Sequence, residues 1–402
     1  MDSAAEVQAW LEPHADEMAD LLAELVAIDT ENPPGRRLGV CGRALHQVMM
    51  QMGFEPELTE IAPTAQLEDP CLVRGSAGDG ARTIYFHGHF DVVPAQSRDQ
   101  FQSRRESGKI IGRGAADMKG GLVSMLYGAA CARDLGLLDD GRIVFHFVCD
   151  EETGSVAGST HLRNSGLIDP QALAMVTAEP TSGDIWHANR GAITLRVEIR
   201  GREAHVGQAH LGENAFEKMI EVARSLTELS HQLLEKRTAF PVESEAARGS
   251  MLVVGGASQT GANFNVVPGS GWFSIDRRFN PEEDLDQEVA RLTDSIAESA
   301  ERVGADVSVE ILQKAPSAST DEHHPASRTL ASCIARIEGT PPRFLMCPGV
   351  LETRWYAQLG IPAFGYGAGR LDVSHGPGEY IDEAAMRRCA AVFALFAGEL
   401  LQ

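Results

Sequence analysis

Hydrophobic residues recur along the first half of the chain with helical spacing and in short strand-like runs. Leu and Ala follow a helical period from Ala5 to Ile28, which predicts a helix that ends before the breaker Asn32-Pro33-Pro34-Gly35. A second helix is predicted over Leu38–Met52, and a third near Gly120–Leu135. Three apolar runs that end in polar residues predict strands at Thr83–His87, Arg142–Cys149 and Ala172–Thr177. The alternation of helices and strands predicts an α/β layered domain.

The pattern changes after Gly191. Strand-like alternation at Ile193–Ile199 precedes a helical segment, two strands that flank a loop, a second helical segment and a last strand. The helical segments are Asn214–Leu234 and Pro281–Val303, the loop is Gly255 to Pro268, and the last strand is Val307–Leu312. This β-α-β-β-α-β order predicts a small ferredoxin-like sandwich inserted into the larger domain.

The domain boundaries follow from this change of pattern. A chain of 402 residues exceeds what one hydrophobic core usually organises. The polar stretch Gln313–His324, which contains Pro316, reads as the linker that returns to the first domain, before the strand Pro362–Tyr366. We therefore expect one domain from residues 1–190 and 314–402, and an inserted domain over 191–313.

Composition narrows the range of partners. The hydrophobic content of 43% is ordinary for a globular protein, whereas the formal net charge of −22 and the pI near 5.0 disfavour nucleic acid and anionic membrane surfaces as partners. Residues 1–20 do not resemble a secretory signal, and no apolar run has the length of a bilayer span. Seven cysteines without a C-x-x-C pair suit reduced thiols, so a cytoplasmic location is expected.

Candidate chemistry begins at the end of the first predicted strand, where open α/β sheets place ligands. His89 and Asp91 are two residues apart, so on an extended backbone both side chains point to the same side. One can bind a metal ion while the other orients it through a second hydrogen bond. The same residues could equally be incidental polar groups at a turn.

Asp117 lies in a glycine-rich loop, Gly112-Arg113-Gly114-Ala115-Ala116-Asp117-Met118-Lys119-Gly120-Gly121, which leads into the predicted helix. A short aspartate held by a tight backbone can place one oxygen on each of two metal ions. A phosphate cradle is the competing interpretation, but neither a P-loop nor a dinucleotide-binding glycine pattern is present.

Adjacent carboxylates occur at Glu151 and Glu152, directly after an apolar strand. Each raises the pKa of the other unless a cation neutralises the pair. A metal ion on one would leave the other free to accept a proton, whereas a pair of solvated acids on a turn is the alternative. Glu179 ends another apolar run. Neither Glu179 nor His375 would indicate a metal site alone, but both become candidate ligands when taken together with the other acids and His89. Together these residues predict a hydrolase with two catalytic metal ions.

The chain resembles the M20 family of metallopeptidases and deacylases, which includes acetylornithine deacetylase, succinyl-diaminopimelate desuccinylase and glutamate carboxypeptidase. The matching segments occur in family order and span nearly the whole chain: HGHFDVVP, GRGAADMKGG, DEETGS, AEPT, GREAHVG, NVVPG, DRR, PGVLETR and SHGPGEYI. The resemblance implies a zinc-peptidase-like catalytic domain with a mixed central sheet flanked by helices. It also implies that the inserted ferredoxin-like α+β domain serves as a lid and dimerisation domain.

The resemblance also implies roles for individual residues. Asp117 becomes the bridging ligand of two divalent metal ions, and its peptide bond to Met118 is implied to be cis. The other ligands implied are His89 and Glu179 for one ion, and Glu152 and His375 for the other. Zn²⁺ is the default ion for this ligand set, and Co²⁺ or Mn²⁺ can occupy similar sites.

The implied mechanism is hydrolysis by a metal-bridging water. Glu151 is the implied general base, which returns the proton to the departing amine, and Asp91 orients His89. His205 is implied to stabilise the carbonyl oxygen from the lid domain of a partner subunit, so a homodimer is expected. Ala204-His205-Val206-Gly207 departs from the common family form at the two positions after the histidine.

Substrate binding is implied for Asn265, Arg278 and Arg354, because a guanidinium group suits a carboxylate. Surface arginines are the alternative, and Arg277 is assigned to that class. Glu352 stands where the family usually has Asp, and Gly378 stands where Asn is common. These departures affect the expected substrate preference and leave the ligand set intact.

The resulting prediction is an N-acyl-L-amino acid amidohydrolase that acts on a small molecule. A dipeptidase or carboxypeptidase that uses the same metal ions is the alternative enzyme. A catalytically silent binding homologue is the alternative of a different class, although every expected ligand and base position carries a competent residue.

Overall fold

The computed structural model describes residues 3–64 and 66–402. The chain divides into two compact units. The first unit comprises Met1–His187, Thr320–Leu345 and Trp355–Gln402, and the second unit comprises Ala188–Ser319 and Met346–Arg354. The stretch Met346–Arg354, which the sequence pattern assigned to the first domain, groups with the second unit.

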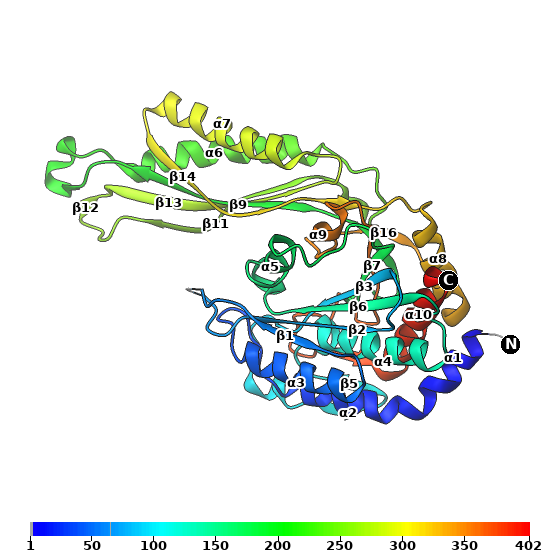
Figure 1. Ribbon diagram of the computed structural model, residues 1–402. Coiled ribbons are helices and arrows are strands. Elements are labelled where there is room, and N and C mark those ends of the chain that lie inside the picture. The colour runs from blue at the N-terminus through cyan, green and yellow to red at the C-terminus, as the bar shows by residue number, and fades with distance from the viewer. Residues whose placement is uncertain (1–2, 65) are drawn as a thin grey trace. The chain divides into compact units, whose positions relative to one another are not determined.

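A mixed sheet forms the centre of the first unit (Figure 1). In spatial order its strands are β1 (Glu57–Glu60), β2 (Cys71–Ala77), β6 (Gly141–Val148), β3 (Arg82–His89), β7 (Ala174–Thr177), β17 (Ala363–Gly365) and β8 (Ile185–Asn189). Strands β6, β3, β7 and β17 run parallel, whereas β1, β2 and β8 pair antiparallel with their neighbours. The parallel strands are almost continuously apolar, because both of their faces are covered.

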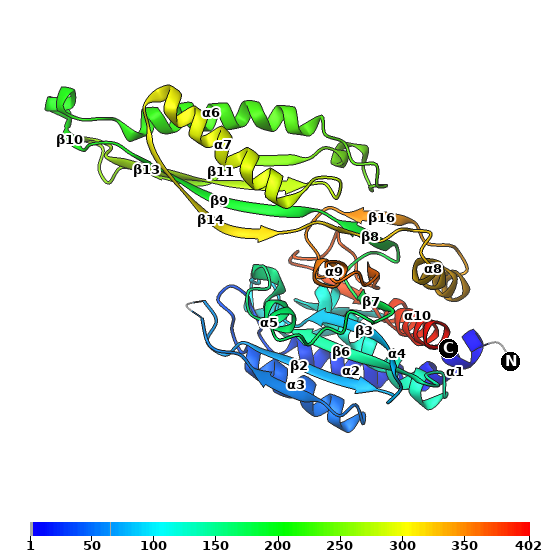
Figure 2. The same cartoon turned by 45° about the horizontal axis from the view of Figure 1, so that its top comes forward.

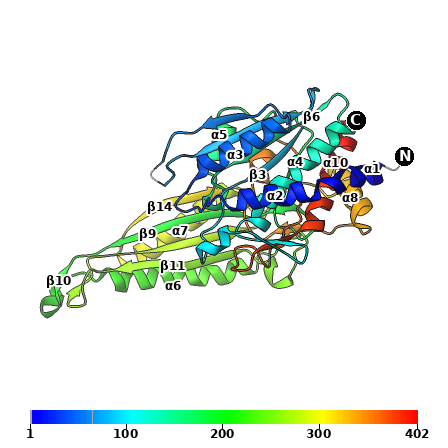
Figure 3. The same ribbon diagram turned by 90° about the horizontal axis from the view of Figure 1, so that it is seen from below.

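Helices cover one face of this sheet and bury the largest hydrophobic cluster of the protein (Figure 3). They are α1 (Ser3–Leu11), α2 (Ala15–Val26), α3 (Leu38–Gln51), α4 (Gly120–Asp134), α8 (Pro325–Glu338) and α10 (Glu383–Leu401). Helices α4 and α10 are apolar on most of their circumference, which suits their position in the interior. Glycine permits their close contact, because a Cβ at Gly128 would lie 2.7 Å from the carbonyl oxygen of Ala390.

The opposite face of the sheet carries a smaller core. Helix α5 (Gly158–Asn164) lies on this side, away from α3 and α4 (Figure 1). Buried Tyr85 stacks on His146, and the hydroxyl of Tyr356 contacts the Nδ1 atoms of both His87 and His146. The first unit is therefore a sheet between two layers, as the sequence pattern predicted.

The predicted helix from Ala5 to Ile28 is wrong in its continuity. The structure interrupts it with a 3₁₀ turn, Glu12–His14, between α1 and α2. Pro13 is the physical reason, since proline has no backbone N–H and its ring clashes with the preceding helical turn. Proline is tolerated in the first turn of a helix, where the structure places it.

The parallel strands end at the same edge of the sheet. His87 of β3 is in register with His146 of β6 and with Thr177 of β7. The segments that follow these three strands therefore begin side by side. They carry the candidate residues Glu151 and Glu179, and His89 ends β3 at the same edge, in agreement with the place where open α/β sheets bind ligands.

A small antiparallel sheet adds a second link between distant segments. Its order is β18 (Tyr380–Asp382), β5 (Lys109–Ile111) and β4 (Arg104–Glu106). Tyr380 is opposite Ile111 in the register. This pairing brings the loop before β18, which contains His375, next to the glycine-rich loop after β5, which contains Asp117.

The second unit has a four-stranded antiparallel sheet in the order β11 (Met251–Thr260), β13 (Ser270–Phe279), β9 (Gly191–Arg200) and β14 (Asp306–Ala315). Helices α6 (Ala215–Leu234) and α7 (Leu285–Val303) lie together on one face of it (Figure 2). Along the chain the order is β-α-β-β-α-β, which confirms the predicted ferredoxin-like arrangement. A short ladder of β10 (Ala204–His205) and β12 (Val266–Val267) extends from it.

Strands β15 (Ala318–Ser319) and β16 (Phe344–Cys347) also belong to the mixed sheet, because both pair with β8, and a short helix, α9, spans Thr353–Ala357. No helix in the described part of the chain combines the length and apolar character needed to cross a membrane. All seven cysteines are buried and free of disulfide bonds.

Candidate metal centre

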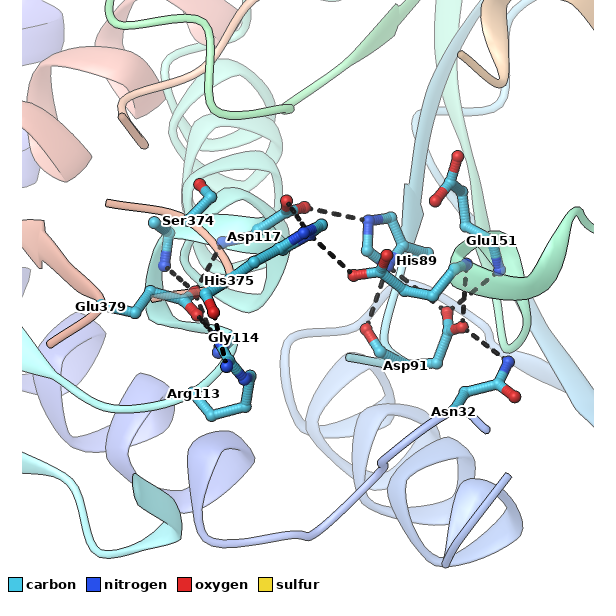
Figure 4. A network of polar contacts seen from close by, with 12 residues as sticks. Asn32, His89, Asp91, Arg113, Gly114, Asp117, Glu151, Ser374, His375 and Glu379 are labelled. Atoms are coloured by element: carbon cyan, nitrogen blue, oxygen red, sulfur yellow. Dashed lines mark hydrogen bonds and ion pairs between the residues drawn. The ribbon is translucent and has the colours of Figure 1, made fainter. Parts of the chain in front are cut away.

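Five candidate ligands of the first unit come from three strand ends and two loops. His89 is the last residue of β3, Glu152 lies in the 3₁₀ turn Glu151–Thr153 after β6, and Glu179 follows β7. Asp117 lies in the segment Ala115–Lys119 before α4, where its own backbone is not helical, and His375 precedes β18. Three of these side chains, His89, Asp117 and His375, are labelled in Figure 4, where they point toward one another although their positions in the sequence are remote.

The first group of potential ligands is His89, Asp117 and Glu179, which are all buried. His89 Nε2 lies 3.3 Å from Asp117 Oδ1 and 3.9 Å from Glu179 Oε1. The second group is Asp117, Glu152 and His375. His375 Nε2 lies 3.1 Å from Asp117 Oδ2 and 3.5 Å from Glu152 Oε1. The two oxygens of Asp117 thus face different groups.

These residues fit divalent metal ions in three respects. Imidazole nitrogens and carboxylate oxygens are ligands that zinc binds, and atoms that share one tetrahedral zinc ion lie about 3.3 Å apart, close to the spacings found here. Across residues 3–64 and 66–402, no donor forms a hydrogen bond to the buried Oε1 of Glu152. The centre also gathers more carboxylates than imidazoles, and buried anions of this kind require nearby positive charge.

The close contacts between imidazoles and carboxylates shift the pKa values of the ligands. Burial opposes protonation of His89, but its contacts with Asp117 and Asp91 outweigh burial and raise its pKa well above the usual value. Contacts with Asp117 and Glu152 raise the pKa of His375 to about 10. Burial favours protonation of Asp117, yet the two imidazoles lower its pKa. Burial raises the pKa of Glu152.

Asp91 organises the turn that follows β6 as well as His89. It is fully buried, and its carboxylate lies 3.3 Å from His89 Nδ1. Its two oxygens accept hydrogen bonds from the backbone N–H groups of Glu151 and Glu152, each at 3.1 Å. The expected base and an expected ligand are therefore held by one carboxylate, which is drawn in Figure 4.

The loop that carries Asp117 has an unusual backbone. The peptide bond between Asp117 and Met118 is cis, which confirms the geometry that the sequence resemblance implied. Gly114 adopts a left-handed conformation with φ of 84°, and a Cβ there would lie 2.6 Å from a methyl group of Val92. Glycine is thus required at this turn for both backbone and steric reasons.

Two predicted residues of the second unit lie next to one another. His205 of β10 is exposed and opposite Val266 of β12, and the N–H of Val206 donates to the carbonyl oxygen of Asn265 at 3.1 Å. His205 Nδ1 accepts a hydrogen bond from the N–H of Gly207 at 3.1 Å. This contact leaves Nε2 as the ring atom directed away from its own turn.

Three arginines of the second unit that were considered for substrate binding differ in their environments. Arg278 is partly exposed and forks onto Asp276, with contacts of 2.7 and 3.1 Å. Arg354 is buried and lies 3.0 Å from Glu352. The assignment of Arg277 to surface arginines is wrong, because this side chain is fully buried and pairs with Glu283 and Glu288.

The alternation of β13 explains the error about Arg277. It has the same parity as the buried residues Phe273, Ile275 and Phe279, so its side chain points to the core face of the strand. The parity of the strand was a readable signal in the sequence. The signal was missed because arginine is usually found at the surface.

Three further polar residues near the centre were not predicted to contribute. Asn32 donates through Nδ2 to Asp91 Oδ2 and to Thr153 Oγ1, both at 2.9 Å. Glu379 and Arg113 form a buried ion pair beside the Asp117 loop. Their positions depend on the pairing of segments that are distant in the sequence, and no local sequence pattern predicts this pairing.

Comparison with known proteins identifies the family of this chain. Residues 85–399 match peptidase family M20/M25/M40. N-formyl-4-amino-5-aminomethyl-2-methylpyrimidine deformylase of Halalkalibacterium halodurans is 23% identical, over 95% of this chain and 93% of its own. Acetylornithine deacetylase of Myxococcus xanthus is 28% identical, over 93% of this chain and 94% of its own. A probable succinyl-diaminopimelate desuccinylase of Staphylococcus epidermidis is 28% identical over about half of each chain, 51% and 50% respectively.

Solved structures share the fold. An M20 family metallo-carboxypeptidase of Sulfolobus solfataricus has a TM-score of 0.80 at 17% identity, covering 96% of this chain and 99% of its own. A dinuclear metal-binding M20 peptidase of Bacillus subtilis has a TM-score of 0.68 at 15% identity, covering 97% and 99%. Because the family match spans most of the chain, the protein is a hydrolase that belongs to peptidase family M20/M25/M40.

Proposed function

We propose that this protein hydrolyses the linear amide bond of an N-acyl-L-amino acid and that two divalent metal ions, by default Zn²⁺, serve as its cofactors. The proposal depends on one observation. Asp117 belongs to both groups of potential ligands, and one of its two carboxylate oxygens faces each group. His89 and Glu179 would complete one ion's ligands, and Glu152 and His375 the other's. Bound divalent ions would polarise the amide carbonyl and lower the pKa of water at the site.

The proton transfers are assigned to Glu151. In the proposed reaction a water oxygen bonds to the carbonyl carbon, and Glu151 accepts the proton that the water loses. The C–N bond then breaks, and Glu151 donates this proton to the departing amine, which gives a carboxylic acid and an amino acid. The hydrogen bond from the Glu151 N–H to Asp91 supports this role, because it holds the base on the same turn as Glu152.

The substrate's carboxylate is assigned to Arg278, Arg354 and Asn265 of the second unit. Arg278 is the more available of the two arginines, because about one third of its side chain is exposed, whereas Arg354 is buried beside Glu352. A substrate carboxylate would either take the place of Asp276 beside the Arg278 guanidinium group or bind this group together with Asp276.

A deacylase is favoured over a peptidase because two curated relatives that each match more than nine tenths of this chain are named as a deformylase and a deacetylase. A screen of N-formyl, N-acetyl, N-succinyl and N-aminoacyl amino acids, each with Zn²⁺, Co²⁺ or Mn²⁺, tests this choice. We expect the highest kcat/KM among the N-acyl substrates. Preference for N-aminoacyl substrates would identify a dipeptidase, and a metal-loaded protein that hydrolyses neither class would be the silent binding homologue.

We further propose that the protein works as a homodimer in which His205 reaches the active site of the partner subunit. The second unit offers apolar surface for an interface, since β11 is an edge strand with exposed Val253, and Phe216 and Ile220 are exposed on α6. Phe264, beside Asn265, is 99% exposed.

Complementation tests the shared site. Homodimers of His205→Ala and of Glu151→Gln should each have low turnover. Co-expression of the two variants should restore part of the activity, because one site of each mixed dimer then has both residues intact. Full turnover by His205→Ala alone, or the absence of any restoration in mixed dimers isolated through two different affinity tags, would contradict the assignment.

A further inference from the structure

The ion pair of Arg113 and Glu379 lies between the two loops that carry Asp117 and His375. Strands β5 and β18 bring these loops together, and the N–H of Gly112 donates to the carbonyl oxygen of Glu379 at 2.9 Å. Both side chains of the pair are buried, at 1% exposure or less. Neither belongs to the two ligand groups, so their function is a separate question.

Glu379 gathers the backbone of the Asp117 loop. Its Oε1 atom accepts hydrogen bonds from the N–H groups of Gly114, Ala116 and Asp117, at 2.9, 3.0 and 3.1 Å. The left-handed Gly114 turns the chain so that these three N–H groups converge on one oxygen, which is the geometry of a backbone anion nest. The third of these donors belongs to the ligand residue itself.

Arg113 extends the contact to the other loop. While its Nη1 atom pairs with Glu379 Oε2, its Nη2 atom donates to the carbonyl oxygen of His375 at 3.0 Å and to Gln96 Oε1 at 3.1 Å. The backbone of Asp117 is therefore connected to the backbone of His375 through one carboxylate and one guanidinium group, as Figure 4 shows.

We propose that Glu379 and Arg113 are positioning residues that hold Asp117 and His375 at the separation a shared divalent ion requires. The proposal rests on the proposed function for the presence of that ion. A buried acid beside several other acids is costly, and a buried ion pair adds little net stability on average. Alignment of the two ligand loops gives a reason for the pair, because a metal site loses affinity when its supporting hydrogen bonds are removed.

Glu379→Gln is the informative variant. A glutamine keeps one carbonyl oxygen for the three N–H donors, but it lacks the charge that pairs with Arg113 and presents an N–H₂ group to the guanidinium. We expect the amide protons of Gly114, Ala116 and Asp117 to exchange with solvent at least about tenfold faster in the metal-free protein. We also expect Zn²⁺ affinity, measured by competition with a chelator, to fall about 10- to 100-fold at the weaker site.

Glu383→Gln is the matched control. Glu383 lies four residues after Glu379 and forks onto Arg105, with contacts of 2.9 and 2.6 Å, rather than onto Arg113. This control should leave both amide exchange and Zn²⁺ affinity unchanged. Arg113→Lys is a second variant in case Glu379→Gln does not fold, because lysine retains a charge near Glu379 and lacks the second terminal nitrogen that donates to the carbonyl oxygen of His375.

The outcomes separate the positioning role from the proposed function. Faster exchange of the three amides and weaker Zn²⁺ binding in Glu379→Gln or Arg113→Lys, with Glu383→Gln unaffected, would support the positioning role. Unchanged exchange and unchanged Zn²⁺ affinity in both variants would overturn it. A wild-type protein that takes up no metal ion would defeat the proposed function, whereas amide exchange would still report whether Glu379 holds the loop.

Discussion

Replacement of Glu151 by glutamine is expected to lower kcat by about 10²- to 10⁴-fold, the range that a positioned general base contributes. Glutamine has nearly the same size and shape but cannot accept the proton of the attacking water at neutral pH. The backbone N–H of residue 151 would still donate to Asp91, so the turn that holds Glu152 should be retained. Steady-state kinetics on the best substrate of the screen measures this effect.

Metal content and thermal stability are the controls for this variant. Glu151 belongs to neither ligand group, so elemental analysis should find the same number of bound ions in Glu151→Gln as in the wild type. Activity close to that of the wild type would refute the assignment of the base. Loss of metal together with activity would instead show that Glu151 supports the ligands.

Replacement of Asp117 by alanine is expected to have the largest effect on metal binding, because Asp117 is common to both ligand groups. Its removal takes one oxygen from each and leaves the remaining ligands as pairs: His89 with Glu179, and Glu152 with His375. We expect affinity to fall by more than about 100-fold, since loss of a supporting residue alone costs 10- to 100-fold. Inductively coupled plasma mass spectrometry after dialysis against a chelator measures the stoichiometry.

Asp372→Asn is the matched control for Asp117→Ala. Asp372 is an exposed acid three residues before His375, and it forks onto Arg370 rather than onto a candidate ligand. Its replacement removes the same formal charge near the centre and should leave metal content unchanged. If Asp117→Ala retained both ions at wild-type affinity, the bridging assignment would be wrong.

Much of the architecture could be read from periodicity. The predicted helix over Leu38–Met52 and the predicted strands of the first unit correspond to α3, β3, β6 and β7 within a few residues. The β-α-β-β-α-β order of the second unit was also readable, because β9 alternates and each of the two helices buries one stripe. Pro13 broke the expected continuity of the first helix, since helical spacing of Leu and Ala continues on both sides of a proline that ends a helix.

Candidate residues were easiest to predict where a polar residue follows an apolar strand. His89, Glu152 and Glu179 satisfy this condition, and parallel strands bring such positions to one edge of a sheet. Asp117 and His375 lie in loops, and their meeting depends on the pairing of β5 with β18. Asp117 was predicted from its glycine-rich loop and His375 from the ensemble of acids and histidines, because no local periodicity marks either position.

The fold class, the family and the kinds of side chain available for the chemistry can all be derived from the amino-acid sequence. These properties depend on local pattern and on motif order, which the linear chain contains. Three other features emerge only from the packed chain: Asp91 holds the backbone of Glu151 and Glu152, Arg277 is buried while Arg278 remains accessible, and Glu379 binds the backbone of the Asp117 loop. Such contacts join residues far apart along the chain, and their distances are set by how strands and loops pack.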